Sequence, residues 1–241
     1  MKNDPRSLLR DIKVAIRLGN PEAVNIALDG LLAFPGVAAN ARMDDAFLNK
    51  IVLPVGESLT PLPTPQLRPL AEHPLAAGRA VGAAALAQQF LTFRRGSPGS
   101  TAAPTGKDLR KFARDPRPDV RAALTLSLRA KDAPDTLFNL GKTWLQDPSP
   151  RVRCAALGFL PALAESYGEE IVTLLAPLGA EADREVRAAL ADALNALGRA
   201  GLAGPVLGLV SRWEAEPVSN SWVIRRVRGA SWAQRAEKSD Q

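Results

Sequence analysis

A short proline-containing pattern occurs twice in this sequence, and it restricts the possible folds more than any other feature. The pattern Asp-Pro-X-Pro-X-Val-Arg begins at Asp115 and again, 32 residues later, at Asp147. In both places a stretch rich in Ala and Leu, which are strong helix formers, follows it. A proline turn followed by an apolar helix at such a period is typical of repeated helical hairpins.

Looser copies extend the repeat in both directions. Glu181 with Val186-Arg187 follows downstream, His73-Pro74 with Arg79 lies upstream, and Asn220 with Ile224-Arg225 forms a weaker fifth copy. A single hairpin cannot bury its apolar side alone, so neighbouring copies must stack. We therefore predict an all-α fold, a right-handed α-solenoid of five to six helical hairpins.

Prolines and glycines divide the chain into regions of one predicted repeat domain, 1–241. We expect atypical N-terminal helices over 1–53, including 6–18, an irregular proline-rich crossover over 54–66, and repeats over 65–230, with a long helix over 75–93. A loop at 94–106 interrupts the repeats, and a polar, frayed tail occupies 231–241. The predicted helix pairs are 107–114 with 117–130, 133–146 with 149–166, 169–180 with 183–199, and 202–214 with 219–230.

Composition excludes several classes of protein. One Cys and one His allow neither a disulfide framework nor an ordinary zinc site, so we predict no metal and no cofactor. The first residues, Met1 to Pro5, contain no apolar signal segment, and no apolar run is long enough to span a bilayer. We expect a cytoplasmic protein without membrane contact.

The repeat resembles HEAT repeats, in which an acid ends the first helix and a Val-Arg pair follows six residues later on the second. Asp115 with Arg121 and Asp147 with Arg153 have this spacing, and Glu181 with Arg187 has it with one acid exchanged for another. The resemblance implies stacked helical hairpins. HEAT arrays most often serve as protein-binding scaffolds.

The recurrent arginines have two possible roles. In one interpretation each Arg bonds the turn acid of its own or the next repeat and holds the register of the stack. In the other, the arginines line a concave face and contact phosphates, which the net charge of +6 would favour, although a genome rich in G and C also enriches Arg. The predicted DNA-binding residues are Arg114, Arg117, Arg121, Arg151, Arg153, Arg187, Arg225 and Arg226.

Two segments are similar to repeats of the DNA alkylation repair family. These segments are Lys142 to Leu157 and the last third of the chain, from Val186 to Arg226. Members of that family are HEAT-like alkylpurine DNA glycosylases, and the resemblance implies that Arg153 contacts DNA. At the place of the family's catalytic Asp this chain has Val120-Arg121, so the catalytic residues are unknown and we favour a protein that is not an enzyme. Asp192 or Glu165 would be the acid if it is one.

The remaining side chains of interest have structural interpretations. Trp144 and Trp213 occupy equivalent repeat positions and are expected in the core, whereas Trp222 and Trp232 could either pack or stack on bases. His73 is expected to be a surface turn residue. Cys154 is expected to be a packed thiol.

Two functional hypotheses follow. In the first, the protein is a DNA-binding HEAT-like repeat protein related to DNA repair, which holds double-stranded or branched DNA on a basic concave face. In the second, it is a HEAT-repeat scaffold for a protein partner, and the arginine row is structural.

Overall fold

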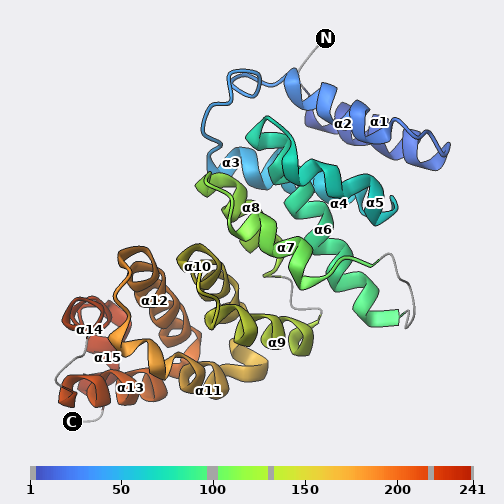
Figure 1. Cartoon of the computed structure of the whole chain (residues 1–241). Coiled ribbons are helices and arrows are strands. Elements are labelled where there is room, and N and C mark those ends of the chain that lie inside the picture. The colour runs from blue at the N-terminus through green and yellow to red at the C-terminus, as the bar shows by residue number, and fades with distance from the viewer. Residues whose placement is uncertain (1–3, 97–102, 130–132, 217–219, 240–241) are drawn as a thin grey trace. The chain divides into compact units, whose positions relative to one another are not determined.

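The computed structural model describes residues 4–96, 103–129, 133–216 and 220–239, and every regular element in these ranges is a helix (Figure 1). The chain forms two compact units, Met1–Leu128 and Arg129–Gln241. Each unit is described by itself.

The first unit is built around α6 (Ala76–Gly96), which packs against α4 (Leu53–Leu59) and α8 (Pro118–Ser127). Alanines on α6 let these helices approach closely. A Cβ on Gly56 of α4 would lie only 2.5 Å from the Cβ of Ala84. The other helices of this unit are α1 (Pro5–Arg17), α2 (Ala23–Leu32), α3 (Asp45–Phe47), α5 (Thr64–Leu67) and α7 (Gly106–Ala113), with a π-helical turn at Leu48–Val52 and a 3-10 turn at Arg68–Glu72.

The second unit is a series of hairpins in which α12 (Arg184–Leu197) packs between α10 (Pro150–Phe159) and α14 (Ser221–Arg228). The first helices of these hairpins are α9 (Pro134–Leu145), α11 (Ala164–Leu175) and α13 (Ala203–Ala215), and α15 (Ser231–Ser239) follows α14. Short 3-10 turns cover Leu160–Leu163 and Ala176–Ala180, and a π-helical turn covers Gly198–Leu202.

Most of the predicted helices are confirmed with small differences at their ends, but α11 (Ala164–Leu175) begins inside the predicted helix 149–166 and ends before residue 180. The repeated prolines mark the first residues of α8 and α10, because the missing N–H has no helical partner at that position. The predicted long helix over 75–93 and the amino-terminal helix over 6–18 correspond to α6 and α1. The single domain and the right-handed solenoid stay predictions.

Two boundaries of the predicted domain map are wrong. The segment 54–66 is not an irregular crossover, because Pro54 lies in the first turn of α4, where proline is tolerated, and Val55 and Leu59 are buried. The tail 231–241 is not frayed over its length, because α15 buries Trp232 and Ala233. Of the loop 94–106, residues 97–102 lie outside the described part, while α6 continues to Gly96 and α7 begins at Gly106.

The stretch Arg184–Ala215 is, by length and composition, apolar enough to cross a membrane. Gly201, with φ of 99°, breaks it into α12 and α13 in a backbone conformation that glycine adopts readily. Leu190, Leu194 and Leu197 of α12 are fully buried in the second unit. The stretch is therefore two core helices of this unit.

Trp232 fixes α15 to the rest of the second unit. Its indole N–H donates to Oδ1 of Asn195 at 2.9 Å, and its ring lies where a Cβ on Gly198 would be only 2.5 Å away. We expect Trp232→Ala to lower the free energy of unfolding by about 3 kcal/mol, as for other buried Trp side chains. Urea denaturation followed by circular dichroism measures this change.

Trp222→Ala is the matched control, because the Trp222 side chain is 42% exposed. We expect it to cost less than about 1 kcal/mol. Equal costs for the two variants would contradict the packing of α15.

Candidate functional site

The second helix of each repeat begins with the same backbone geometry, which aligns the repeats. In each of these helices the backbone N–H of the fourth residue donates to the carbonyl of the N-cap residue, which directly precedes the helix, at 3.0 to 3.3 Å. The donor and acceptor pairs are Arg79 to Leu75, Arg121 to Arg117, Arg153 to Ser149, Arg187 to Asp183 and Ile224 to Asn220. We call Arg79, Arg121, Arg153 and Arg187 the ladder arginines.

In three of these turns an acid two residues before the N-cap residue accepts the N–H of that residue and so closes the turn. A carboxylate oxygen of Asp115 accepts the N–H of Arg117 at 2.8 Å, and Asp147 accepts that of Ser149 at 2.8 Å. Glu181 does the same for Asp183 at 2.9 Å. In the upstream copy, the Nδ1 atom of His73 lies 3.2 Å from the N–H of Leu75 and takes the place of the carboxylate. His73 is therefore a turn residue, as predicted.

Each of the first three ladder arginines also holds its own turn. The Nη1 group of Arg121 donates to the carbonyls of Asp115 at 2.8 Å and Pro116 at 3.1 Å. Arg153 donates in the same way to Asp147 at 2.9 Å and Pro148 at 3.3 Å. Arg79 donates to the carbonyls of its own turn at 2.8 and 3.1 Å. These carbonyls precede the helix, so the guanidinium satisfies acceptors that the helix leaves unpaired.

The other edge of the guanidinium reaches the acid of the following turn. Arg79 donates through Nε and Nη2 to Asp115 at 2.6 and 3.3 Å, and Arg153 donates to Glu181 at 3.1 and 3.2 Å. The side chains of both pairs are at most 15% exposed. Such two-bond pairs between Arg and carboxylate are strong and fix geometry. One such pair joins consecutive repeats in each unit.

The ladder changes at Arg187. The carbonyl of Glu181 accepts from the side-chain amide of Asn220 at 3.0 Å, and within the described ranges the Arg187 guanidinium has no hydrogen bond or ion pair. In the next repeat the position of a ladder arginine belongs to Ile224, which is buried, and Arg225 lies one residue later on the exposed side of α14. The sequence alignment of Ile224-Arg225 with Val-Arg was thus wrong by one residue.

Arg117 is a structural anchor in the first unit. It pairs with Asp119 at 2.9 Å and donates to the carbonyls of Asn40 and Ala41, both at 3.0 Å, while Asp119 also accepts the N–H of Met43. Burial alone would raise the pKa of Asp119, but the hydrogen bonds from Arg117 and the Met43 N–H outweigh it and hold this pKa below its ordinary value.

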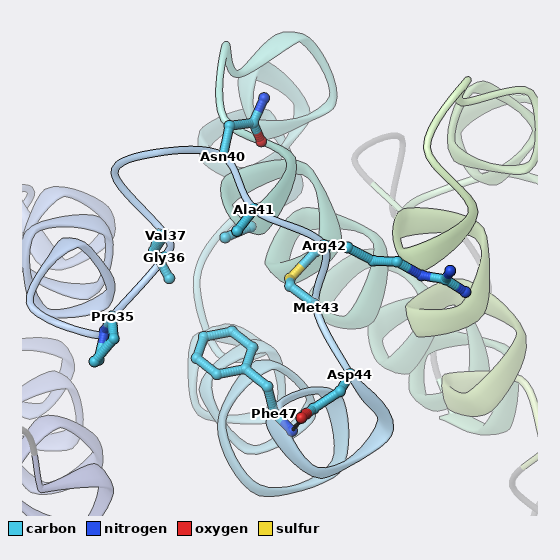
Figure 2. A pocket seen from close by; sticks show the side chains of 10 residues that line it. Pro35, Gly36, Val37, Asn40, Ala41, Arg42, Met43, Asp44 and Phe47 are labelled. Carbon is cyan, nitrogen blue, oxygen red and sulfur yellow. Dashed lines mark hydrogen bonds between the residues drawn. The ribbon is translucent and has the colours of Figure 1, made fainter.

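The segment anchored by Arg117 borders a cavity of about 140 Å³. Figure 2 shows Met43 and Phe47 facing this space, while the Arg42 side chain extends away from it. Asn40 has a φ of 52°, and its side chain accepts the N–H of Ala76 at the start of α6. The lining combines polar residues, Asn40, Arg42 and Asp44, with apolar ones such as Met43 and Phe47.

The eight predicted DNA-binding residues are divided between the two units. Arg114, Arg117 and Arg121 belong to the first unit, and the other five belong to the second. Arg114, Arg151 and Arg225 are exposed. Arg226 pairs with Asp192 at 3.0 Å and lies over the Trp222 ring, 5.5 Å from its centre.

Three of the four tryptophans are core residues. Trp144 packs edge-on against Phe159, and Trp213 donates to the carbonyl of Ala176 at 3.0 Å, as predicted for both. The sequence left open whether Trp222 and Trp232 pack or stack on bases, and Trp232 is buried. Trp222 is exposed. No group of three or more His, Cys, Asp or Glu side chains in the described residues could hold a metal ion.

A cationic surface on α1 was missed by the sequence analysis. Arg6, Arg10, Lys13 and Arg17 are all exposed and are spaced four, three and four residues apart. This spacing places them on one face of the helix. The signal in the sequence is this spacing of basic residues within the predicted helix 6–18.

The HEAT repeats family model matches residues 106–195. The match covers the turns at Asp115, Asp147 and Glu181 with their helices, so this segment is built from HEAT repeats. No curated protein and no solved structure matches the chain. The finer resemblance to the DNA alkylation repair family has no support among these comparisons.

The pair between Arg153 and Glu181 should contribute to stability. We expect Arg153→Ala to lower the free energy of unfolding by about 3 kcal/mol, because it leaves the Glu181 carboxylate, only 11% exposed, without its cation and leaves two turn carbonyls without a donor. Thermal and urea denaturation measure the change, and a double-mutant cycle with Glu181→Gln gives the coupling. Arg187→Ala, at the same repeat position, is the control and should cost less than about 1 kcal/mol. A similar cost for both would refute the ladder.

Asp119 should make the stability of the first unit depend on pH. Its folded pKa is lowered, so its contribution is present above the unfolded pKa of about 3.9 and is lost as pH falls through the lower folded value. We expect Asp119→Asn to destabilise the protein by about 3 kcal/mol at pH 7. This difference should shrink below about pH 4.

Urea denaturation at pH 7 and at pH 3 tests the Asp119 prediction, with Asp45→Asn on the exposed surface as the control. A difference that stays constant over this pH interval would show that the carboxylate charge is not involved.

Proposed function

We propose that this chain is a HEAT-repeat scaffold that binds a protein partner and has no catalytic activity. The observation that carries the proposal is the use of the ladder arginines inside the protein. Arg79 and Arg153 each make hydrogen bonds to two carbonyls of their own turn and to the acid of the next. These bonds correspond to the interpretation in which each Arg bonds a turn acid and holds the register of the stacked repeats.

Arg153 has little capacity left for a phosphate. A guanidinium has five N–H donors, and Arg153 makes four hydrogen bonds, two to carbonyls and two to Glu181. The Glu181 carboxylate also neutralises its charge. A phosphate would have to displace a bonded carboxylate, so this residue, which the resemblance had implied as a DNA contact, favours a scaffold.

The distribution of charge argues in the same direction. Basic and acidic residues are equal in number from Arg129 to Gln241, so the whole excess of +6 lies in 1–128. Five of the eight predicted DNA-binding residues are in the balanced second unit. A polyanion is attracted chiefly by net positive charge, which this unit lacks.

No arrangement of the residues considered for catalysis favours glycosylase chemistry. Arg121 stands where the resembled family has its catalytic carboxylate, and it binds the carbonyls of its own turn. Of the two other acids considered, Asp192 pairs with Arg226 on the surface, and Glu165 is exposed on α11. We do not propose an enzymatic activity.

An equilibrium titration with labelled duplex and four-way branched DNA separates the two hypotheses. We expect no saturable binding below about 10 µM at 50 mM salt, because Arg79 and Arg153 are already paired with carboxylates and the second unit has no net charge. Fluorescence anisotropy is the measurement. Saturable binding that weakens steeply between 50 and 200 mM salt, and that Arg153→Ala reduces in a folded protein, would overturn the scaffold proposal in favour of DNA.

Chemical cross-linking of the full chain in its own cells tests the scaffold proposal directly. Peptides cross-linked to the chain identify the partner, and the purified pair should form a complex of defined stoichiometry in analytical ultracentrifugation. Cross-links to nucleic acid alone would contradict the proposal.

A further inference from the structure

The exposed face of α1 carries an uninterrupted row of positive charge. We call Arg6, Arg10, Lys13 and Arg17 the α1 stripe. The opposite face of the helix, with Leu8, Ile12 and Ala15, is buried against α2 and α4. Eleven residues separate the ends of the stripe, which corresponds to about 16 Å of helix.

The stripe has almost no compensating charge of its own. Arg10 pairs with Asp11 at 3.5 Å, and both side chains are more than half exposed. Asp4 accepts the backbone N–H of Arg6, and Glu57 lines the same groove as Lys13 and Arg17. In the described part of the chain, Arg6, Lys13 and Arg17 make no ion pair. Exposed pairs such as that of Arg10 contribute little, so the stripe keeps its positive potential.

A groove of about 390 Å³ runs beside the stripe, between α1 and α4. Lys13 and Arg17 of the stripe line it on the α1 side, and Glu57 lines it on the α4 side. Its apolar lining comes from Leu9 and Ile16 of α1 and from Pro54 and Pro61, and Ser58 completes it. The groove thus has cations on its α1 side, an anion on its α4 side, and apolar groups among the residues of both sides.

This arrangement favours a protein segment over a nucleic acid. A phosphate backbone would pair with the stripe, but it would leave the apolar lining unfilled and would meet the Glu57 carboxylate. A helix that projects apolar side chains at intervals of three and four residues can fill such a groove. The α1 lining from Leu9 to Arg17 spans about two helical turns, which matches two or three such side chains.

We propose that the groove between α1 and α4 binds an amphipathic helical segment of a partner protein. The segment places acidic side chains on the α1 stripe, apolar side chains against Leu9, Ile16 and Pro54, and a basic side chain near Glu57. This inference rests on the proposed scaffold function, and it assigns the partner's chemistry and its site.

Synthetic peptides of about 16 residues serve as probes, since a helix of this length covers the groove. The acidic probe has Leu at intervals of three and four residues, Glu along one flank and Lys along the other. A scrambled probe has the same composition, and a reversed probe has Lys in place of each Glu. Fluorescence anisotropy with the full chain measures binding of each probe and of a labelled DNA duplex.

We expect the acidic probe to bind the full chain at least about tenfold more tightly than the scrambled probe. The double variant Lys13→Glu with Arg17→Glu should weaken binding of the acidic probe about tenfold and should strengthen binding of the reversed probe. Such a reversal of charge preference cannot arise from misfolding. The double variant Arg42→Glu with Lys50→Glu, two exposed sites of the same unit outside the groove, should leave both affinities unchanged.

Equal binding of the acidic and scrambled probes, or an acidic-probe affinity unchanged by Lys13→Glu with Arg17→Glu, would overturn the assignment of the groove. Tighter binding of the DNA duplex, lost in the same variant, would assign the stripe to nucleic acid instead. If the cross-linked partner complex persists in this variant, the groove assignment fails while the scaffold function stands.

Discussion

The structure depends on a guanidinium that bonds two successive turns at once. Arg153 donates to the carbonyls of its own turn and to Glu181 of the next, and Arg79 does the same with Asp115. Because the fork of the guanidinium is planar and rigid, it fixes both the distance and the orientation between neighbouring hairpins. Helix packing alone, through Ala and Leu side chains, would allow neighbouring repeats to slide.

The same arrangement explains why the turns tolerate different residues. Any side chain that accepts the N–H of the capping residue can close the turn, and Asp115, Glu181 and the imidazole of His73 all do so. The upstream copy needs no acid in its turn, because Arg79 reaches forward to Asp115. The ladder is therefore directional, and the carboxylates of Asp115 and Glu181 each belong to two repeats.

Because Arg79 and Arg153 are bonded within the protein, the scaffold proposal places partner recognition on other surfaces. The candidate surfaces lie where the repeat pattern is absent, at the α1 stripe in the first unit and at exposed Arg225 and Trp222 in the second. The α1 stripe has a groove with apolar lining beside it. In the scaffold proposal, the repeats supply the frame and the irregular residues supply the specificity.

The sequence by itself determined the helical hairpins and the first residues of α8 and α10. The period of the Asp-Pro and Val-Arg steps, together with prolines at helix starts, defines them locally, as at Asp115 and Asp147. It could not decide between the two roles of Arg153, because a guanidinium has enough donors for either a carboxylate or a phosphate. Only the tertiary structure, which brings Glu181 to 3.1 Å from Arg153 across 28 residues, shows that Arg153 bonds the acid of the next turn. It also decided that Trp232 is buried and Trp222 exposed, since burial depends on which residues of distant helices meet them, here Asn195 and Gly198.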